Sequence, residues 1–365
     1  MAGSLHGIRV LEIASIGPGP HAAMMLSDMG AEVVRVERPG ADGKPSPAPD
    51  DPVLRGRLRV ALDLKSDNGI GELYELIERA DVLIEGFRPG TTERLGFGPE
   101  QCARANPGLI YGRMTGWGQY GPLADSAGHD INYIALTGAL HSIGPAADVP
   151  PPPLNLVGDF GGGSTYLTLG IVAALVERAR SGLGQVVDAA MVDGVSSLMQ
   201  MTWSLRRTGI WNDERSSNSL DGTAPFYRTY RCGDGRFVAV GAIEPQFYAA
   251  FVSGLGIDAG SLSAQRDRAG WTRLTEIFSA RLAEMPRDYW EERFSGTDAC
   301  VTPVLALDEV ESHPHNVARG YVSREGRATM SSPAPRLSRT PSTAGAEPID
   351  TTVESIGQRW HNRSD

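Results

Sequence analysis

The sequence predicts an α/β protein with a large Rossmann-like domain and a smaller α/β domain. Short apolar strand candidates alternate with helical periodicity over the first third of the chain, which is the pattern of a parallel sheet with right-handed crossovers. A Gly/Pro loop follows the first strand candidate directly and precedes a helix candidate. After Leu220 the pattern changes to a hairpin followed by helices, so a second domain begins near that residue.

The strand candidates of the large domain are short and rich in Val, Ile and Leu. They are residues 8–14 (IRVLEIA), 32–37 (EVVRVE), 59–64 (RVALDL), 81–87 (DVLIEGF) and 109–114 (LIYGRM). Helical periodicity lies between strand candidates at 21–29 and 68–80. Residues 39–52 hold so many Pro, Gly and Asp residues that we expect a mobile loop there.

Longer helices are predicted in the middle of the chain. One runs from about Thr165 to Arg180 after the Gly161–Gly163 run, and another runs from about Val192 to Thr208 and is expected to link two domains. The elements predicted for the second domain are strands at 226–232 and 236–243 and helices at 245–255, 271–284 and 287–294. Residues 330–346, rich in Ser, Pro, Thr and Ala, are expected to form an extended strap.

Composition indicates an ordinary globular protein. The 365 residues are 41% hydrophobic and 21% charged, and the net charge of −10 argues against a general nucleic-acid surface. The longest apolar run, 166–176, is too short to cross a bilayer, and we expect no export signal. Cys102, Cys232 and Cys300 lack the spacing of a disulfide framework or zinc site, which favours a cytoplasmic location.

One short stretch is rich in basic residues despite the negative net charge. It is interpreted either as a site for an anionic ligand or as an ordinary solvated surface. Its members are Arg35, Arg38, Lys44, Arg55, Arg57, Arg59 and Lys65.

Several common motifs are absent. The loop at 17–20 (GPGP) is not G-x-G-x-x-G, and its prolines lack the N–H groups that would bind a pyrophosphate, so no nicotinamide or flavin cofactor is expected. Neither a P-loop nor a G-x-S-x-G elbow occurs. His313 and His315 lack neighbouring carboxylates, so no metal site is predicted.

The segment GHDINY at 128–133 places His129 and Asp130 at the start of a predicted helix. Asp130 can cap that helix, and the residues alone favour a core histidine over a catalytic one for His129. Asp159 is in the same way read as a helix cap before Gly161–Gly163, and Glu244 as a helix start before Pro245. Each of these residues alone is weak evidence for a site.

Several longer segments of the sequence resemble those of a known protein family. They are VLEIASIGPGP (10–20), GHDINY (128–133), LNLVGDFGGG (154–163), LDGTAPFY (220–227), AIEPQFY (242–248), GTDACVTPVL (296–305) and SRTP (338–341). In this order they resemble the α-methylacyl-CoA racemases of the family III CoA-transferase superfamily over nearly the whole chain. Thr223 stands where racemases often have a second Gly, and residues 39–52 match poorly.

The resemblance implies a set of site residues. His129 and Asp159 correspond to the two proton-transfer groups, and Glu244 to the acid that partners the histidine. Contacts with coenzyme A are implied for Arg38, Leu62, Asp63, Leu64, Lys65, Gly128, Asp130, Ile131, Asn132 and Tyr133, and less strongly for Arg88 and Arg94.

The resemblance also implies the architecture and the activity. Residues 1–187, completed by 320–365, would form the CoA-binding domain, 188–222 a linker helix region and 223–319 the small domain, in an interlocked homodimer. The activity would be that of an isomerase of branched-chain lipid metabolism, which inverts 2-methylacyl-CoA through an enolate. Coenzyme A would be part of the substrate, and no separate cofactor would be needed.

The residue types suit that chemistry. Inverting a carbon that bears one hydrogen needs an acid/base group on each face, which His129 and Asp159 supply, and Glu244 would fix the tautomer of His129. Asp159 needs burial to raise its pKa toward the working pH. Two alternatives stay open: a CoA-transferase in which Asp159 attacks the thioester, and a CoA-binding protein without catalysis.

Overall fold

The structure, a computed structural model, describes residues 3–46, 51–144, 149–325 and 328–361. The chain divides into two compact units. Unit 1 comprises Met1–Thr137, Pro153–Met199 and His315–Asp365, and unit 2 comprises Gly138–Pro152 and Gln200–Pro314. Part of the loop predicted at 39–52 lies outside the described residues, at 47–50.

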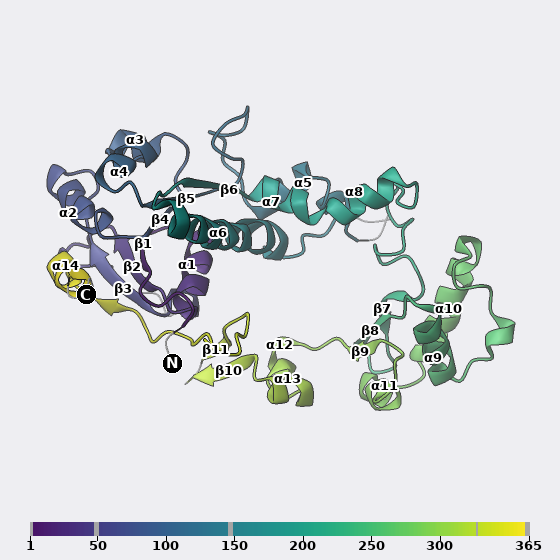
Figure 1. Cartoon of the computed structure of the whole chain (residues 1–365). Helices are drawn as coiled ribbons and strands as arrows, with labels where there is room; N and C mark the ends of the chain where they lie inside the picture. Colours follow the sequence, from purple (N-terminus) through teal and green to yellow (C-terminus); the bar gives the residue numbers. More distant parts are fainter. Residues whose placement is uncertain (1–2, 47–50, 145–148, 326–327, 362–365) are drawn as a thin grey trace. The chain divides into compact units, whose positions relative to one another are not determined.

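Unit 1 contains a seven-stranded sheet, helices on both faces of that sheet and a separate hairpin (Figure 1). The sheet strands are β1 (Arg9–Ile13), β2 (Glu32–Glu37), β3 (Arg57–Ala61), β4 (Val82–Glu85), β5 (Ile110–Thr115), β6 (Val186–Ala190) and β12 (Ile349–Asp350), and the hairpin is β10 (Val322–Glu325) with β11 (Ala328–Ser331). The helices are α1 (Pro18–Asp28), α2 (Asp67–Ile77), α3 (Thr91–Leu95), α4 (Pro99–Ala105), α5 (Asp130–Leu136), α6 (Thr165–Ser181), α7 (Met191–Leu198), α13 (Pro314–Arg319) and α14 (Val353–His361).

All neighbouring strands of the large sheet are parallel, in the order β12-β3-β2-β1-β4-β5-β6. The six strands from β3 to β6 have the order of a Rossmann fold, so the predicted fold class is confirmed. The strand order reverses between β1 and β4, and the loops that follow these strands therefore diverge at the carboxyl edge of the sheet. Ligand sites of open α/β sheets lie at such a point.

The sheet separates two apolar cores because side chains alternate along each strand. Val10 and Val33 pack with α1 and α6, whereas Leu11 and Val34 pack with α2 and α14 on the other face. Both faces are buried, which explains why apolar residues occupy adjacent positions in these strands.

The Gly/Pro loop after β1 changes the start of the first helix. The helix predicted at 21–29 begins earlier, at Pro18. Gly17 precedes it with φ +69°, a left-handed conformation that glycine adopts at low cost, and Pro18 occupies a first-turn position where no N–H is needed. The chain therefore turns sharply from β1 into α1, and residues 15–20, which include the first turn of α1, are called the 15–20 loop below.

The helix α6 follows a π-helical segment, η3 (Leu156–Ser164). Together the two run from Leu156 to Ser181, and among the described residues this is a stretch long and apolar enough to cross a membrane by length and composition alone. It carries Leu167 and Ile171, which are fully buried in the core beside β5. The buried side of α6 accounts for the apolar residues that face the core. The apolar run 166–176 noted in the sequence is only part of this longer stretch.

Unit 2 contains an antiparallel sheet in the order β7-β8-β9 and several helices. Its elements are α8 (Gln200–Arg207), β7 (Tyr227–Arg231), β8 (Phe237–Gly241), α9 (Pro245–Leu255), α10 (Trp271–Leu282), α11 (Arg287–Phe294), β9 (Val301–Pro303) and α12 (Leu307–Val310). Phe251, Phe278 and Trp290 are buried at the centre of its core. The predicted hairpin and helices are present, and β9 is an additional strand.

Two predictions need correction. The single helix predicted from Val192 to Thr208 is two helices, α7 and α8, because the backbone at Met199 leaves the helical conformation. The strap predicted at 330–346 begins inside β11, and the described residues after β11 up to β12 form neither helix nor strand. The strap is held to unit 1 where Thr343 donates its N–H to the carbonyl of Asp28 and Gly56 donates to that of Ala346.

Candidate active site

Two cavities lie at the carboxyl edge of the large sheet. The first, the inner cavity, has a volume of about 430 Å³ and is lined by the residues that follow β1, β4 and β5, together with His129 and Asp159. The second, the outer cavity, has a volume of about 850 Å³ and is lined by the residues that follow β1, β2, β3 and β4. Phe87 lines both cavities. The cavities therefore adjoin where the strand order reverses.

His129 lies at the start of α5 with an exposed side chain. Its N–H donates to Asn132 Oδ1 at 3.0 Å, which fixes the backbone at the first turn of the helix. The Tyr133 hydroxyl donates to the carbonyl of Gly128 and anchors the residue before His129. The imidazole of His129 is thus placed at the wall of the inner cavity by a well-bonded turn.

Asp159 lies within the π-helical segment and is half-buried. Its N–H donates to Asp130 Oδ2 at 2.7 Å, and its Oδ2 accepts a hydrogen bond from Asn155 at 3.1 Å. Burial raises the pKa of Asp159 and the charge of Asp130 raises it further, whereas the Asn155 hydrogen bond and His129 act in the opposite direction. The raised pKa is the direction expected for a carboxylate that serves as a base near neutral pH.

The interpretation of Asp159 as a helix cap is wrong, because Asp159 lies inside the π-helical segment. Single π-helical turns are rare and occur often at functional sites. Gly162 and Gly163 in the same segment are buried, and they allow close packing against α7: a Cβ on Gly162 would lie 2.7 Å from the side chain of Val195. This packing holds the segment that carries Asp159.

The outer cavity brings together residues predicted to contact coenzyme A. Arg38, Leu62, Asp63, Leu64, Lys65 and Arg94 all line it. The side chains of Arg38, Lys65 and Arg94 are exposed, and three cations facing one cavity favour an anionic ligand.

The remaining predicted contacts lie elsewhere. Arg88 lines the inner cavity, and so do Gly128 and Tyr133. Asp130 is buried and accepts a hydrogen bond from the N–H of Asp159, whereas Ile131 and Asn132 are exposed on α5. Direct contact of these three residues with a ligand stays a prediction.

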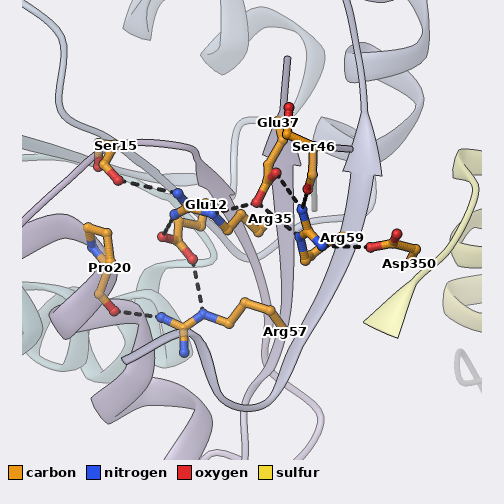
Figure 2. Close-up of polar contacts among 9 residues, drawn as sticks. All are labelled: Glu12, Ser15, Pro20, Arg35, Glu37, Ser46, Arg57, Arg59 and Asp350. Atoms are coloured by element: carbon orange, nitrogen blue, oxygen red, sulfur yellow. Dashed lines mark hydrogen bonds and ion pairs between the residues drawn. The ribbon is translucent and has the colours of Figure 1, made fainter. Parts of the chain in front are cut away.

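Most of the basic stretch is not available to a ligand. Arg35 and Arg57 pair with Glu12, and Arg59 pairs with Glu37 and Asp350 (Figure 2). Arg55 pairs with Asp28 in the same buried manner. Arg38, Lys44 and Lys65 are the exposed members, so neither interpretation of the whole stretch is correct.

Glu244 lies in unit 2, at the N-cap position of α9. Its side chain is exposed. Burial raises the pKa of the Cys300 thiol, and the negative charge of Glu244 adds to this effect, which places the two side chains in one neighbourhood. The pairing of Glu244 with His129 stays a prediction.

Several residues that line the inner cavity were not predicted from the sequence. Ser15, Ile16 and Gly17 follow β1, and Gly86 precedes Phe87 after β4. Their signal was positional, because residues directly after parallel strands meet at the carboxyl edge of a sheet. Ile16 is 85% exposed and presents an apolar surface at this cavity.

The sequence matches the family described as CoA-transferase family III over residues 5–349. It is 48% identical to "Alpha-methylacyl-CoA racemase" of Mus musculus, over 94% of this chain and 89% of the mouse protein. It is 46% identical to the protein of the same name from Homo sapiens, over 93% of this chain and 87% of the human protein. The structure of this chain resembles the crystal structure of a CAIB/BAIF family protein from Brucella suis with a TM-score of 0.81 and 24% sequence identity, and the match covers 100% of each chain. This similarity supports the fold.

Proposed function

Because this chain belongs to CoA-transferase family III, we propose that it is an isomerase that interconverts (2R)- and (2S)-2-methylacyl-CoA thioesters. The observation that carries the proposal is that His129 and Asp159 line one cavity, while three exposed cations line the adjoining one. The high identity to mouse and human racemases over most of the chain supports the same reaction.

Coenzyme A would bind with its phosphates in the outer cavity. Arg38, Lys65 and Arg94 can neutralise phosphate charges there, although the protein as a whole carries a net charge of −10. The pantetheine arm would pass Phe87, which lines both cavities, and bring the thioester into the inner cavity. Ile16 and Met191 would give the acyl chain an apolar wall.

The proton transfer would use one group on each face of the α-carbon. In one direction the carboxylate of Asp159 removes the α-proton, and the imidazolium of His129 returns a proton to the opposite face. In the other direction the neutral imidazole removes the proton and the carboxylic acid of Asp159 returns one. The raised pKa of Asp159 supports both roles, since an acid/base group works best near the operating pH.

Between the two transfers the thioester oxygen carries the negative charge of an enolate. Backbone N–H groups aimed at that oxygen would stabilise it. The N–H of His129 is already donated to Asn132, so the donor would be another N–H group of this turn. Glu244 would support the imidazolium of His129 and fix its orientation.

The decisive experiment uses one enantiomer of a 2-methylacyl-CoA in heavy water without a second acid, followed by proton NMR. We expect α-proton exchange together with inversion, and loss of inversion in both His129→Ala and Asp159→Ala, because a full reaction needs both groups. Trapping of an acyl group on Asp159, or acyl transfer to an added carboxylate without exchange, would instead establish a CoA-transferase.

An interlocked homodimer is part of the proposal. Large apolar side chains are exposed on helices of the described chain, among them Leu169 on α6, Leu198 on α7 and Met201 on α8. An interlocked dimer would cover exposed apolar side chains of this kind. Light scattering after size-exclusion chromatography should give twice the mass of one chain.

A cytoplasmic location is also proposed. Cys102, Cys232 and Cys300 are free in the structure, and the first two are buried. Free thiols persist in a reducing compartment. Fractionation of cells that produce the protein, with antibody detection, tests the location.

A further inference from the structure

Glu12 lies in the central strand β1 and its side chain is completely buried. Its two carboxylate oxygens accept hydrogen bonds from two arginines: Oε1 from Arg35 Nη1 and Oε2 from Arg57 Nε at 3.0 Å (Figure 2). Arg35 comes from β2 and Arg57 from β3, and both are buried. Burying such an ion pair gives little net stability compared with apolar packing, so its presence in the core calls for another role.

Each arginine uses another N–H group to hold a backbone carbonyl. Arg35 Nη2 donates to the carbonyl of Ser15 at 3.2 Å, and Arg57 Nη2 donates to the carbonyl of Pro20 at 2.5 Å. Ser15 lies in the connection between β1 and α1, and Pro20 lies in the first turn of α1, so these residues are the two ends of the 15–20 loop. A planar guanidinium has its donors in fixed directions, so Glu12, which contacts both arginines, directs both toward the ends of this loop. Glu37 also holds Arg35 Nε, and the carbonyl of Arg55 also holds Arg57 Nη1.

The loop between these two anchors forms part of the inner cavity. Ser15, Ile16 and Gly17 line it together with His129 and Asp159. Gly17 lies close to Asp159: a Cβ built on it would be 3.5 Å from Asp159 Oδ2. Any movement of the loop would therefore change the surroundings of the Asp159 carboxylate.

We propose that Glu12 is a positioning residue for the racemisation: through Arg35 and Arg57 it holds the 15–20 loop against Asp159. This inference rests on the proposed function. Glu12 does not line either cavity, and it acts only through the two arginines. Apolar residues at the same place would fill the space without fixing the direction of either carbonyl.

The test is Glu12→Gln in the full-length protein, which keeps the size of the side chain and removes the charge that orients both guanidinium groups. We expect kcat for inversion to fall by roughly tenfold to a hundredfold, since displacements of about 1 Å at a reacting group have effects of this order. KM should change less than about threefold, because the Arg35–Glu37 contact beside the outer cavity remains.

The pH profile supplies a readout that a merely structural role would not change. Asp159 is needed as a carboxylate in one direction, so activity falls as the pH drops through its pKa. A displaced loop would expose the carboxylate, which faces Asp130 and His129, and the acid limb of kcat should move to lower pH. A loss of folded protein alone would lower the amplitude at every pH and leave the limb in place.

Asp28→Asn is the matched control. The Asp28–Arg55 pair is also buried, with Arg55 Nε donating to Asp28 Oδ1 at 2.9 Å, but it lies at the far end of α1 from the loop. This variant should lose stability and keep the kcat and the acid limb of the wild type. If Glu12→Gln does not fold, Arg57→Lys replaces it, because a lysine keeps a cation beside Glu12 and cannot also hold Pro20.

The outcomes separate the two proposals. A wild-type protein without α-proton exchange would remove the proposed function itself. An active wild type with unchanged kcat and pH profile in Glu12→Gln and Arg57→Lys would overturn the positioning role alone. An equal fall of kcat in Asp28→Asn would also overturn it, because the effect would then follow from any broken ion pair in the core.

Discussion

Gly194→Ala should show how closely Asp159 depends on its supporting helix. Gly194 lies in α7 and faces the π-helical segment that carries Asp159. A Cβ added to Gly194 would lie 1.9 Å from the carbonyl oxygen and 2.6 Å from the carbonyl carbon of Gly162. Backbone atoms cannot rotate away as the end of a side chain can, so the two segments must separate.

The size of the effect follows from the geometry. Ordinary contact begins at about 3.4 Å, so the segments must move apart by roughly 1.5 Å from the 1.9 Å of the present geometry. Overpacking of this kind costs about 1–3 kcal/mol of unfolding free energy. A shift of about 1 Å in a catalytic group costs on the order of a hundredfold in rate, so kcat should fall by that order.

Urea unfolding and the heavy-water inversion assay measure the two effects. Gly357→Ala is the matched control, because Gly357 lies in α14 with nothing within 4 Å of an added Cβ. That substitution should stabilise the protein by about 0.5–1 kcal/mol, since glycine is unfavourable inside helices, and leave kcat unchanged. Wild-type stability and kcat in Gly194→Ala would refute the argument that this close approach positions Asp159.

Three further predictions concern other parts of the molecule. Arg38→Ala should raise KM for the acyl-CoA on the order of tenfold without lowering kcat, because it removes a charged donor to a phosphate, and an unchanged KM in steady-state kinetics would exclude that contact. Glu244→Gln should lower kcat on the order of tenfold or more through loss of support for His129, and wild-type turnover would leave Glu244 with its helix-start role only. Burial raises the pKa of Glu85 to about 7, although the Phe87 N–H and Arg113 lower it. Between pH 4.5, the ordinary pKa of this carboxyl group, and pH 7, the folded protein therefore keeps Glu85 protonated while the unfolded chain loses that proton. The free energy of unfolding of the wild type relative to Glu85→Gln should therefore be greatest below pH 4.5 and fall by up to about 1.4 kcal/mol per pH unit as the pH rises toward 7. If urea unfolding gives the same difference between the two proteins at every pH, the pKa of Glu85 is not raised.

The parallel sheet could be predicted because its strands are buried on both faces. Residues 32–37 (EVVRVE) have valines that point to both faces of the sheet, and β2 has the same bounds. The strands β6 and β12 were not predicted for a physical reason. β6 is partly exposed at the edge of the sheet, and β12 has only two residues, so neither has a buried apolar pattern.

The roles of the basic residues could not be predicted from their number. Arg35, Arg57 and Arg59 lie within strands, and each pairs with a carboxylate in another strand. A count of charges along the chain does not reveal pairing across a sheet, because register is set by tertiary structure. The exposed cations Arg38 and Lys65 come from the loops after β2 and β3 instead.

The π-helical segment was missed because its hydrogen bonds leave no periodic signal in a stretch rich in glycine. Asp159 before the glycine run resembles an ordinary helix start, which is a common arrangement. The structure shows that the glycines serve close packing against α7, and Asp159 is inside the helical segment rather than at its cap. Glycines that permit close approach and glycines that end a helix are indistinguishable without the partner element.

The cations and the proposed acid/base groups line two different cavities, and this arrangement suits a reaction on both faces of one carbon. The exposed cations that would bind the CoA phosphates come from the loops after β2 and β3 and from α3, whereas the proposed proton-transfer groups lie at the N-cap of α5 and in the π-helix. Binding energy from the nucleotide can therefore hold the thioester in place while the acyl group changes its orientation nearby. The rigid part of the inner cavity must then be the part that touches the bases, and that is where Glu12 and its two arginines hold the 15–20 loop.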